Sequence, residues 1–179
     1  GQGMDVGNDE LMALLRKHGM VERTILLGMR EDVPRVMQGF DLHVLSSRAE
    51  GFPNVVAEAM AAGVLCVVTD VGDAAYIVDD TGWVVPPRNA FALARGIEQA
   101  VATAGTPAAA SRVDAGRQRV MSLFSLESMV ANWQAVWRRL AVDYPQPGCE
   151  AIGRRLLFVV NNPAFFLSHR LPLALAARD

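Results

Sequence analysis

The sequence predicts an α/β fold in which helices cover both faces of a mainly parallel sheet. Two observations support this fold class. Short runs rich in β-branched residues and leucine alternate with longer segments of helical periodicity along the chain. Residues 65–69 form a continuous, largely apolar run, as expected of a strand that is buried on both faces.

Capping residues and glycines predict the bounds of the first helices and of the first strand. Asn8 or Asp9 can cap a helix that ends near Gly19. Residues 24–27 are expected to form a strand. Asp32 is placed to cap a short helix whose first turn contains a proline, where the missing N–H costs no hydrogen bond.

The central elements follow the same alternation. Residues 42–45 predict a strand, and residues 46–53 form the loop that leaves it. A helix is expected over residues 54–62, because Gly63 is a typical helix stop. The apolar run at residues 65–69 is then the next strand.

The remaining elements complete the predicted domain. Residues 70–73 turn the chain, and residues 82–85 form a short strand that two prolines end. Helices are expected at residues 89–102 and 107–122, and Ser125 can cap a last helix. That helix carries a broad apolar stripe, which is expected to pack in the core: Leu126, Met129, Val130, Trp133, Val136, Trp137 and Leu140.

Composition excludes several classes of protein. The 179 residues carry a net charge of −2, so there is no polycationic field to hold a nucleic-acid backbone. No apolar run approaches the roughly 20 residues needed to span a bilayer, and no basic-then-apolar leader is visible. Cys66 and Cys149 are too few and too far apart for a disulfide scaffold. A cytoplasmic protein with reduced thiols is expected.

The loop and helix around Glu50 and Glu58 carry the strongest functional signal. Open α/β sheets bind ligands where loops leave the carboxyl ends of their strands. Gly51 allows the backbone to approach a ligand, and Pro53 precedes a helix start whose free N–H groups favour phosphate. Carboxylates accept strong hydrogen bonds from sugar hydroxyls. Together these features indicate a ligand that carries both hydroxyls and phosphate, such as a nucleotide sugar.

Residues 46–54 (SSRAEGFPN) and 58–63 (EAMAAG) resemble the Glu-x7-Glu signature of retaining glycosyltransferase family 4. Similar landmarks occur at residues 28–33, 69–72 and 82–87, so the resemblance covers about residues 1–141 in unbroken order. It implies the C-terminal, donor-binding half of a GT-B fold, in which two Rossmann-like domains face each other across a cleft. The chain would then be truncated at both ends and lack its N-terminal partner domain.

The resemblance also implies roles for individual residues. Glu58 would hold the ribose of a nucleoside diphosphate sugar, and Glu50 would act as the catalytic residue beside the reacting carbon of the sugar. No metal or other cofactor is expected. The other donor-binding residues lie in the same loop and helix start, or in the loop that borders the base: Gly51, Phe52, Pro53, Asn54, Arg30 and Glu31.

The chain departs from the family in two places. The Arg and Lys that contact the diphosphate in the family belong to a segment upstream of Gly1. Asp73 and Tyr76 stand where the family has a second glycine and a glutamate, so contacts from that loop are in doubt. The fragment is therefore expected to be inactive alone.

The expected domain organisation has three parts. Residues 1–142 form the nucleotide-sugar-binding domain, and residues 143–153 form a linker. Residues 154–179 resemble the first strand and helix of a second family 4 domain, in a tandem enzyme or a permuted order of halves. The acceptor would be a glycan or a lipid-linked glycan. The paired arginines at 138–139 and 154–155 fit either peripheral contact with a membrane or a solvated face.

Two other functions stay open at this point. A nucleotide-sugar 2-epimerase shares the GT-B fold but needs acid and base groups beyond those found. A non-catalytic, Rossmann-like interaction module would be favoured if Glu50 and Glu58 pointed into separate environments.

Overall fold

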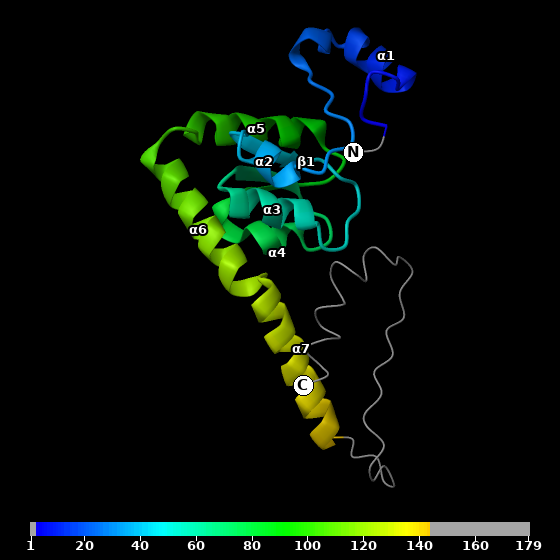
Figure 1. Ribbon diagram of the computed structural model, residues 1–179. Helices are drawn as coiled ribbons and strands as arrows, with labels where there is room; N and C mark the ends of the chain where they lie inside the picture. Colours follow the sequence, from blue (N-terminus) through cyan, green and yellow to red (C-terminus); the bar gives the residue numbers. More distant parts are fainter. Residues whose placement is uncertain (1–2, 144–179) are drawn as a thin grey trace.

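Three parallel strands form the centre of the fold. The computed structural model describes residues 3–143, and its sheet has the order β1 (Leu42–Leu45), β2 (Leu65–Thr69), β3 (Trp83–Val85) (Figure 1). Leu42 lies opposite Leu65, and Val67 lies opposite Trp83. Each pair of parallel neighbours is joined by a helical crossover, so the predicted parallel sheet is confirmed.

Helices account for most of the remaining described chain, and the bounds of the helices that were predicted agree with the structure to within a few residues. Capping by Asn8 and Ser125 is confirmed, because each side chain accepts a backbone N–H of the following helix. Asn89, which was not predicted as a cap, caps its helix in the same way. In chain order the elements are α1 (Asp9–Lys17), η1 (Val21–Arg23), α2 (Val33–Met37), α3 (Asn54–Ala62), α4 (Ala74–Val78), η2 (Asp79–Thr81), α5 (Ala90–Thr103), α6 (Pro107–Leu123) and α7 (Leu126–Asp143).

Helices cover both faces of the sheet. Helix α5 lies so close to one face that a Cβ on Gly96 would meet Cγ1 of Val85 at 2.9 Å and Cγ1 of Val67 at 3.2 Å. Cys66 and Val68 point to the other face, where they share a core with residues of α3, α4 and α6. Because neighbouring side chains of a strand point to opposite faces, β2 is buried along its whole length, as its apolar sequence predicts.

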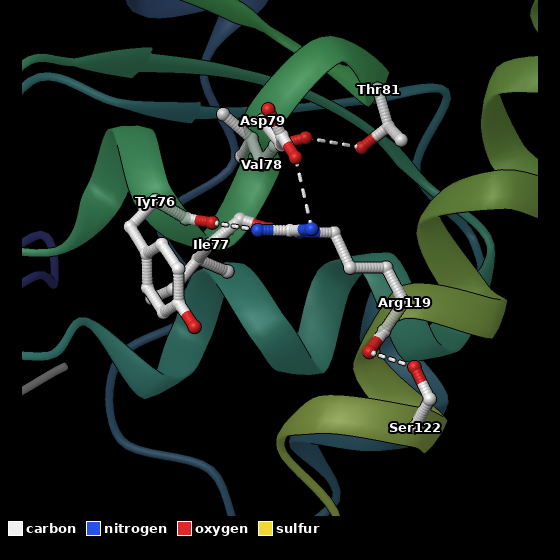
Figure 2. A network of polar contacts seen from close by, with 7 residues as sticks. All are labelled: Tyr76, Ile77, Val78, Asp79, Thr81, Arg119 and Ser122. Atoms are coloured by element: carbon white, nitrogen blue, oxygen red, sulfur yellow. Dashed lines mark hydrogen bonds and ion pairs between the residues drawn. The ribbon is translucent and has the colours of Figure 1, made fainter.

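Helix α4 was not predicted from the sequence, which indicates only a turn at residues 70–73. Its residues Ala74, Ile77 and Val78 are fully buried against the sheet. Arg119 of α6 donates hydrogen bonds to the carbonyl oxygens of Tyr76 and Ile77 near the end of this helix (Figure 2). A five-residue helix is too short to be stable alone, so tertiary packing holds it.

The predicted strand at residues 24–27 is wrong. Thr24 has an extended backbone, but the segment belongs to no sheet, and Ile25 is 85% exposed. Within residues 3–143, β1 pairs with β2 alone, and residues 24–27 pair with no strand. Strand formation needs such a partner, because an isolated extended segment cannot satisfy its backbone groups by itself.

The prediction that the α7 stripe packs in the core is also wrong. Helix α7 runs away from the sheet (Figure 1), and none of residues 126–139 is buried. Trp133 remains 40% exposed and Val136 41% exposed. The rings of Trp133 and Trp137 lie 6.0 Å apart and contact each other. Helical periodicity identified the apolar face correctly but did not identify what covers it.

Helix α7 extends through Asp143, the first residue of the predicted linker. The rest of that linker and the predicted second domain at residues 154–179 lie outside the described residues. Between residues 3 and 143, no helix is long and apolar enough to cross a membrane.

Candidate functional site

The carboxyl ends of the three strands lie at one edge of the sheet. Residues 46–53 follow β1, residues 70–73 follow β2, and residues 86–89 follow β3. This edge is where ligands bind in open α/β sheets, because the loops leave room there and helix starts expose free N–H groups. The predicted site residues Glu50, Gly51 and Phe52 belong to the first of these loops.

Glu50 lies in a loop that the sheet holds in place. Its carboxylate accepts a hydrogen bond of 2.6 Å from the Ser47 hydroxyl. The carbonyl oxygen of Ser47 in turn accepts a hydrogen bond of 2.8 Å from the hydroxyl of Thr69, at the end of β2. Glu50 is nevertheless exposed. Its carboxylate is therefore oriented by the protein and accessible to a ligand.

Gly72 brings the second loop against the first. A Cβ at this position would lie 2.2 Å from the carbonyl oxygen of Gly51 and 2.5 Å from that of Glu50. The next residue, Asp73, donates its backbone N–H to the Gly51 oxygen at 2.8 Å. Sequence analysis identified Gly72 only as a family landmark. Its position just after a buried strand is the signal for a close approach of two backbones.

Phe52 and Tyr76 both make aromatic contacts with Phe124. The ring of Phe52 packs edge-on against Phe124 at a centroid distance of 5.4 Å, and Tyr76 contacts the same ring at 5.7 Å. Arg119 lies over the Tyr76 ring at 5.4 Å. Tyr76, which stands where the family has a glutamate, is thus part of the packing between α4 and the end of α6.

The start of α3 presents free backbone donors. Pro53 is buried at the N-cap position, and Asn54 begins the helix in an exposed position. The first hydrogen bond of the helix joins the N–H of Val56 to the carbonyl of Pro53. The N–H groups of Asn54 and Val55 find no acceptor in the described part of the chain. Such a helix start attracts anions such as phosphate.

Glu58 lies in the second turn of the same helix. Its neighbours Val56, Ala59 and Met60 are buried, whereas Glu58 itself is exposed. Its carboxylate makes no hydrogen bond or ion pair with any residue in the described range. The apolar sequence around Glu58 therefore reflects the buried face of α3, while the carboxylate stays free for a ligand. That Glu50 and Glu58 converge on one ligand stays a prediction.

Arg30 is engaged within its own loop. Its guanidinium donates two hydrogen bonds to the Asp32 carboxylate, at 2.7 and 2.6 Å. These hydrogen bonds lower the pKa of Asp32 from its ordinary value and raise that of Arg30. Asp32 precedes α2, but its side chain does not cap the helix as predicted, because Arg30 occupies the carboxylate. Glu31 is exposed, and neither it nor Arg30 bonds to residues 46–58 in the described structure.

An open hollow of about 550 Å³ lies beside the loops that follow β1 and β3. Sequence reasoning missed it, because its residues come from two distant segments with no shared motif. Arg88 has a φ of 58°, which is unusual for a residue other than glycine. The six residues that line the hollow are Ser46, Arg48, Arg88, Asn89, Ala90 and Leu93.

No group of three or more His, Cys, Asp or Glu side chains with metal-binding geometry occurs between residues 3 and 143. The candidate site consists of the loop after β1, the start of α3 and the loop after β2. These features define a class of ligand-binding α/β domain, in which the loops at the carboxyl edge of a parallel sheet hold the ligand.

The chain belongs to the glycosyl transferases group 1 family, whose sequence pattern matches residues 2–103. A similar protein is the UDP-Gal:alpha-D-GlcNAc-diphosphoundecaprenol alpha-1,3-galactosyltransferase of Escherichia coli. It is 35% identical over 71 residues, which are 37% of this chain and 18% of the relative.

Solved structures agree with this assignment. A glycosyltransferase from Rickettsia africae ESF-5 matches with a TM-score of 0.73 and 23% identity, over 80% of this chain and 39% of the other. HepE from Anabaena in complex with UDP matches with a TM-score of 0.60 and 26% identity, over 74% of this chain and 36% of the other. HepE has also been solved with UDP-glucose. These neighbours have the GT-B fold, which confirms the predicted fold class. The chain spans less than half the length of each of these three proteins.

Proposed function

We propose that this chain forms the donor-binding part of a retaining glycosyltransferase. The enzyme transfers a sugar from a nucleoside diphosphate sugar to a glycan or lipid-linked acceptor. The observation that carries the proposal is the loop after β1, in which Ser47 orients the exposed Glu50 carboxylate at 2.6 Å. The free N–H groups at the start of α3 follow directly after this loop.

Each element of the site has a role in this proposal. The amides of Asn54 and Val55 hold a phosphate of the donor at the positive end of the helix dipole. Glu58 accepts hydrogen bonds from the ribose hydroxyls, and Glu50 accepts them from the sugar close to its reacting carbon. The Gly51 backbone and Pro53 shape the pocket. The complexes of the similar HepE with UDP and UDP-glucose support this choice of ligand.

Transfer breaks the bond between the anomeric carbon and the diphosphate oxygen, which leaves with the bonding electron pair, and forms a bond from that carbon to the acceptor oxygen. The proton of the acceptor hydroxyl passes to the departing diphosphate. In our proposal, electrostatic stabilisation of the departing diphosphate lowers the barrier without a bound metal. In the proposed enzyme, the partner domain and the Arg and Lys that contact the diphosphate in the family are not among residues 1–179. We therefore expect residues 1–179 to bind donor weakly and to transfer no sugar alone. Cytoplasmic location and contact with a membrane surface belong to the proposal as well.

The test is a titration of the ¹⁵N-labelled 179-residue chain with UDP-glucose and, in parallel, ADP- and GDP-linked sugars. We expect one of them to bind with a dissociation constant on the order of millimolar. Its chemical-shift changes should include the amides of Gly51, Asn54 and Val55. Glu58→Ala should weaken binding by about tenfold, the equivalent of one charge-assisted hydrogen bond.

Glu98→Ala is the matched control, because Glu98 is an exposed helical carboxylate on α5. Its removal should leave the affinity unchanged. Equal binding by the Glu58→Ala variant and the parent chain would overturn the assigned pocket. A Rossmann-like interaction module without nucleotide-sugar binding would then be the better description.

A further inference from the structure

The hollow beside the ends of β1 and β3 has the character of an anion site. Arg48 reaches it from the loop after β1, and Arg88 reaches it from the loop after β3. Neither guanidinium makes a hydrogen bond or ion pair with another residue in the described part of the chain. No carboxylate is among the six lining residues. Two unpaired cations that face one hollow create a positive potential there.

The start of α5 adds backbone donors to the same place. Asn89 caps this 14-residue helix, and its side chain accepts the N–H of Ala92 at 2.9 Å. The N–H groups of Ala90 and Phe91 have no acceptor between residues 3 and 143. Ala90 lines the hollow, so the positive end of the helix dipole lies at its wall. Two guanidinium groups, a helix start and the Ser46 hydroxyl together suit the many acceptor oxygens of a phosphate.

The backbone of Arg88 supports a binding role for its side chain. At a φ of 58° a glycine or asparagine would be accommodated with less strain than arginine. The hollow of about 550 Å³ is in the size range of small-molecule sites. Its lining residues include none of those assigned to the donor in the proposed function.

We infer that this hollow binds a phosphate or diphosphate group through Arg48, Arg88 and the start of α5. The inference goes beyond the proposed function, because the two sites share no lining residue. Only the source of the phosphate rests on the proposed function. Two sources supply this chemistry in a glycosyl transfer. They are the diphosphate of the nucleotide sugar and a diphosphate on a lipid-linked acceptor.

The test uses the ¹⁵N-labelled 179-residue chain and inorganic pyrophosphate as the probe. We expect saturable shifts of the Ser46, Asn89 and Ala90 amides. Arg88→Gly and Arg48→Gln should each weaken pyrophosphate binding by about tenfold, the effect of losing one charge-assisted contact. Arg95→Gln, which removes an exposed cation from α5 outside the hollow, should bind pyrophosphate like the parent chain.

The variants are chosen to keep the fold intact. Glycine relieves the positive φ at residue 88, so Arg88→Gly should unfold at a temperature equal to or above that of the parent. Arg88→Asn, which also tolerates this conformation, provides a second neutral variant. Parent-like affinity in both the Arg88 and the Arg48 variants would overturn the inference. Shifts that spread over the surface and follow ionic strength alone would overturn it as well.

A second arm identifies the source of the phosphate. Pyrophosphate is titrated in the presence of saturating UDP. Competition at the Ser46 and Asn89 amides would assign the hollow to the donor diphosphate, whereas simultaneous binding would assign it to the acceptor. The Glu58→Ala variant keeps the two proposals apart, because it should weaken nucleotide-sugar binding and leave pyrophosphate binding unchanged.

Discussion

Arg119 and Asp79 form an ion pair in which Nη1 of the arginine lies 2.9 Å from a carboxylate oxygen of the aspartate (Figure 2). The pair joins α6 to the turn η2 that follows α4. The same guanidinium also donates to the carbonyl oxygens of Tyr76 and Ile77, at 2.6 and 3.1 Å. One side chain therefore satisfies the end of a short helix and connects it to a long one.

Arg119→Ala should lower the free energy of unfolding by about 2 kcal/mol, because two helix-end carbonyls lose their partner. Asp79→Asn should lower it by less than about 1 kcal/mol, since the Asp79 side chain is 58% exposed and solvent screens the ion pair. Chemical denaturation measures both effects. Arg95→Ala, which breaks an exposed ion pair on α5, is the control and should change stability by less than about 0.5 kcal/mol. Equal losses for Arg119→Ala and Arg95→Ala would contradict this role.

Gly72→Ala should destabilise the fold and disturb the two loops of the candidate site. The added Cβ would meet the backbone oxygens of Gly51 and Glu50 at 2.2 and 2.5 Å, so the two loops must separate. We expect a loss of more than about 2 kcal/mol of stability, together with amide shifts throughout residues 46–54. Gly105→Ala is the matched control, because Gly105 also has a positive φ but nothing within 4 Å. It should cost about 1 kcal/mol and leave the site unchanged.

His43 should make the fold less stable at mildly acidic pH. Desolvation lowers the pKa of this β1 histidine from its ordinary value of 6.5, and its Nε2 atom is buried without a partner. The unfolded chain therefore binds a proton more readily than the folded chain as the pH falls below 6.5. The free energy of unfolding, measured between pH 7.5 and about pH 5, should decrease in that direction. His43→Leu should flatten this decrease, and an unchanged slope would disprove the contribution of His43.

Cys66 should resist thiol reagents in the folded protein. Burial raises the pKa of its thiol to about 12, so little thiolate is present at neutral pH. A Cys149→Ser variant isolates its reaction with a disulfide reagent at about pH 8. We expect labelling at least about a thousandfold slower in the native state than in denaturant, because the thiolate fraction falls with pKa. Rapid native labelling would show that β2 opens easily.

Most of the local structure could be predicted from the amino-acid sequence. Apolar runs located all three strands of the sheet, and caps such as Asn8 and Ser125 located helix starts, because these signals act within a few residues. The loop after β1 and its carboxylates were also identified from the sequence. Glu50 and Glu58 are there, exposed, on the loop and helix where they were expected.

Tertiary structure alone decided the features that depend on a distant partner. Residues 24–27 have the sequence of a strand but pair with no strand within the described chain, and the α7 stripe is apolar but uncovered. The Asp32 carboxylate accepts hydrogen bonds from Arg30 and does not cap the start of α2. The close approach of Gly72 to Gly51 and the hollow between Arg48 and Arg88 arise where loops from different strands meet. Such contacts join residues far apart in the chain, and no local pattern encodes them.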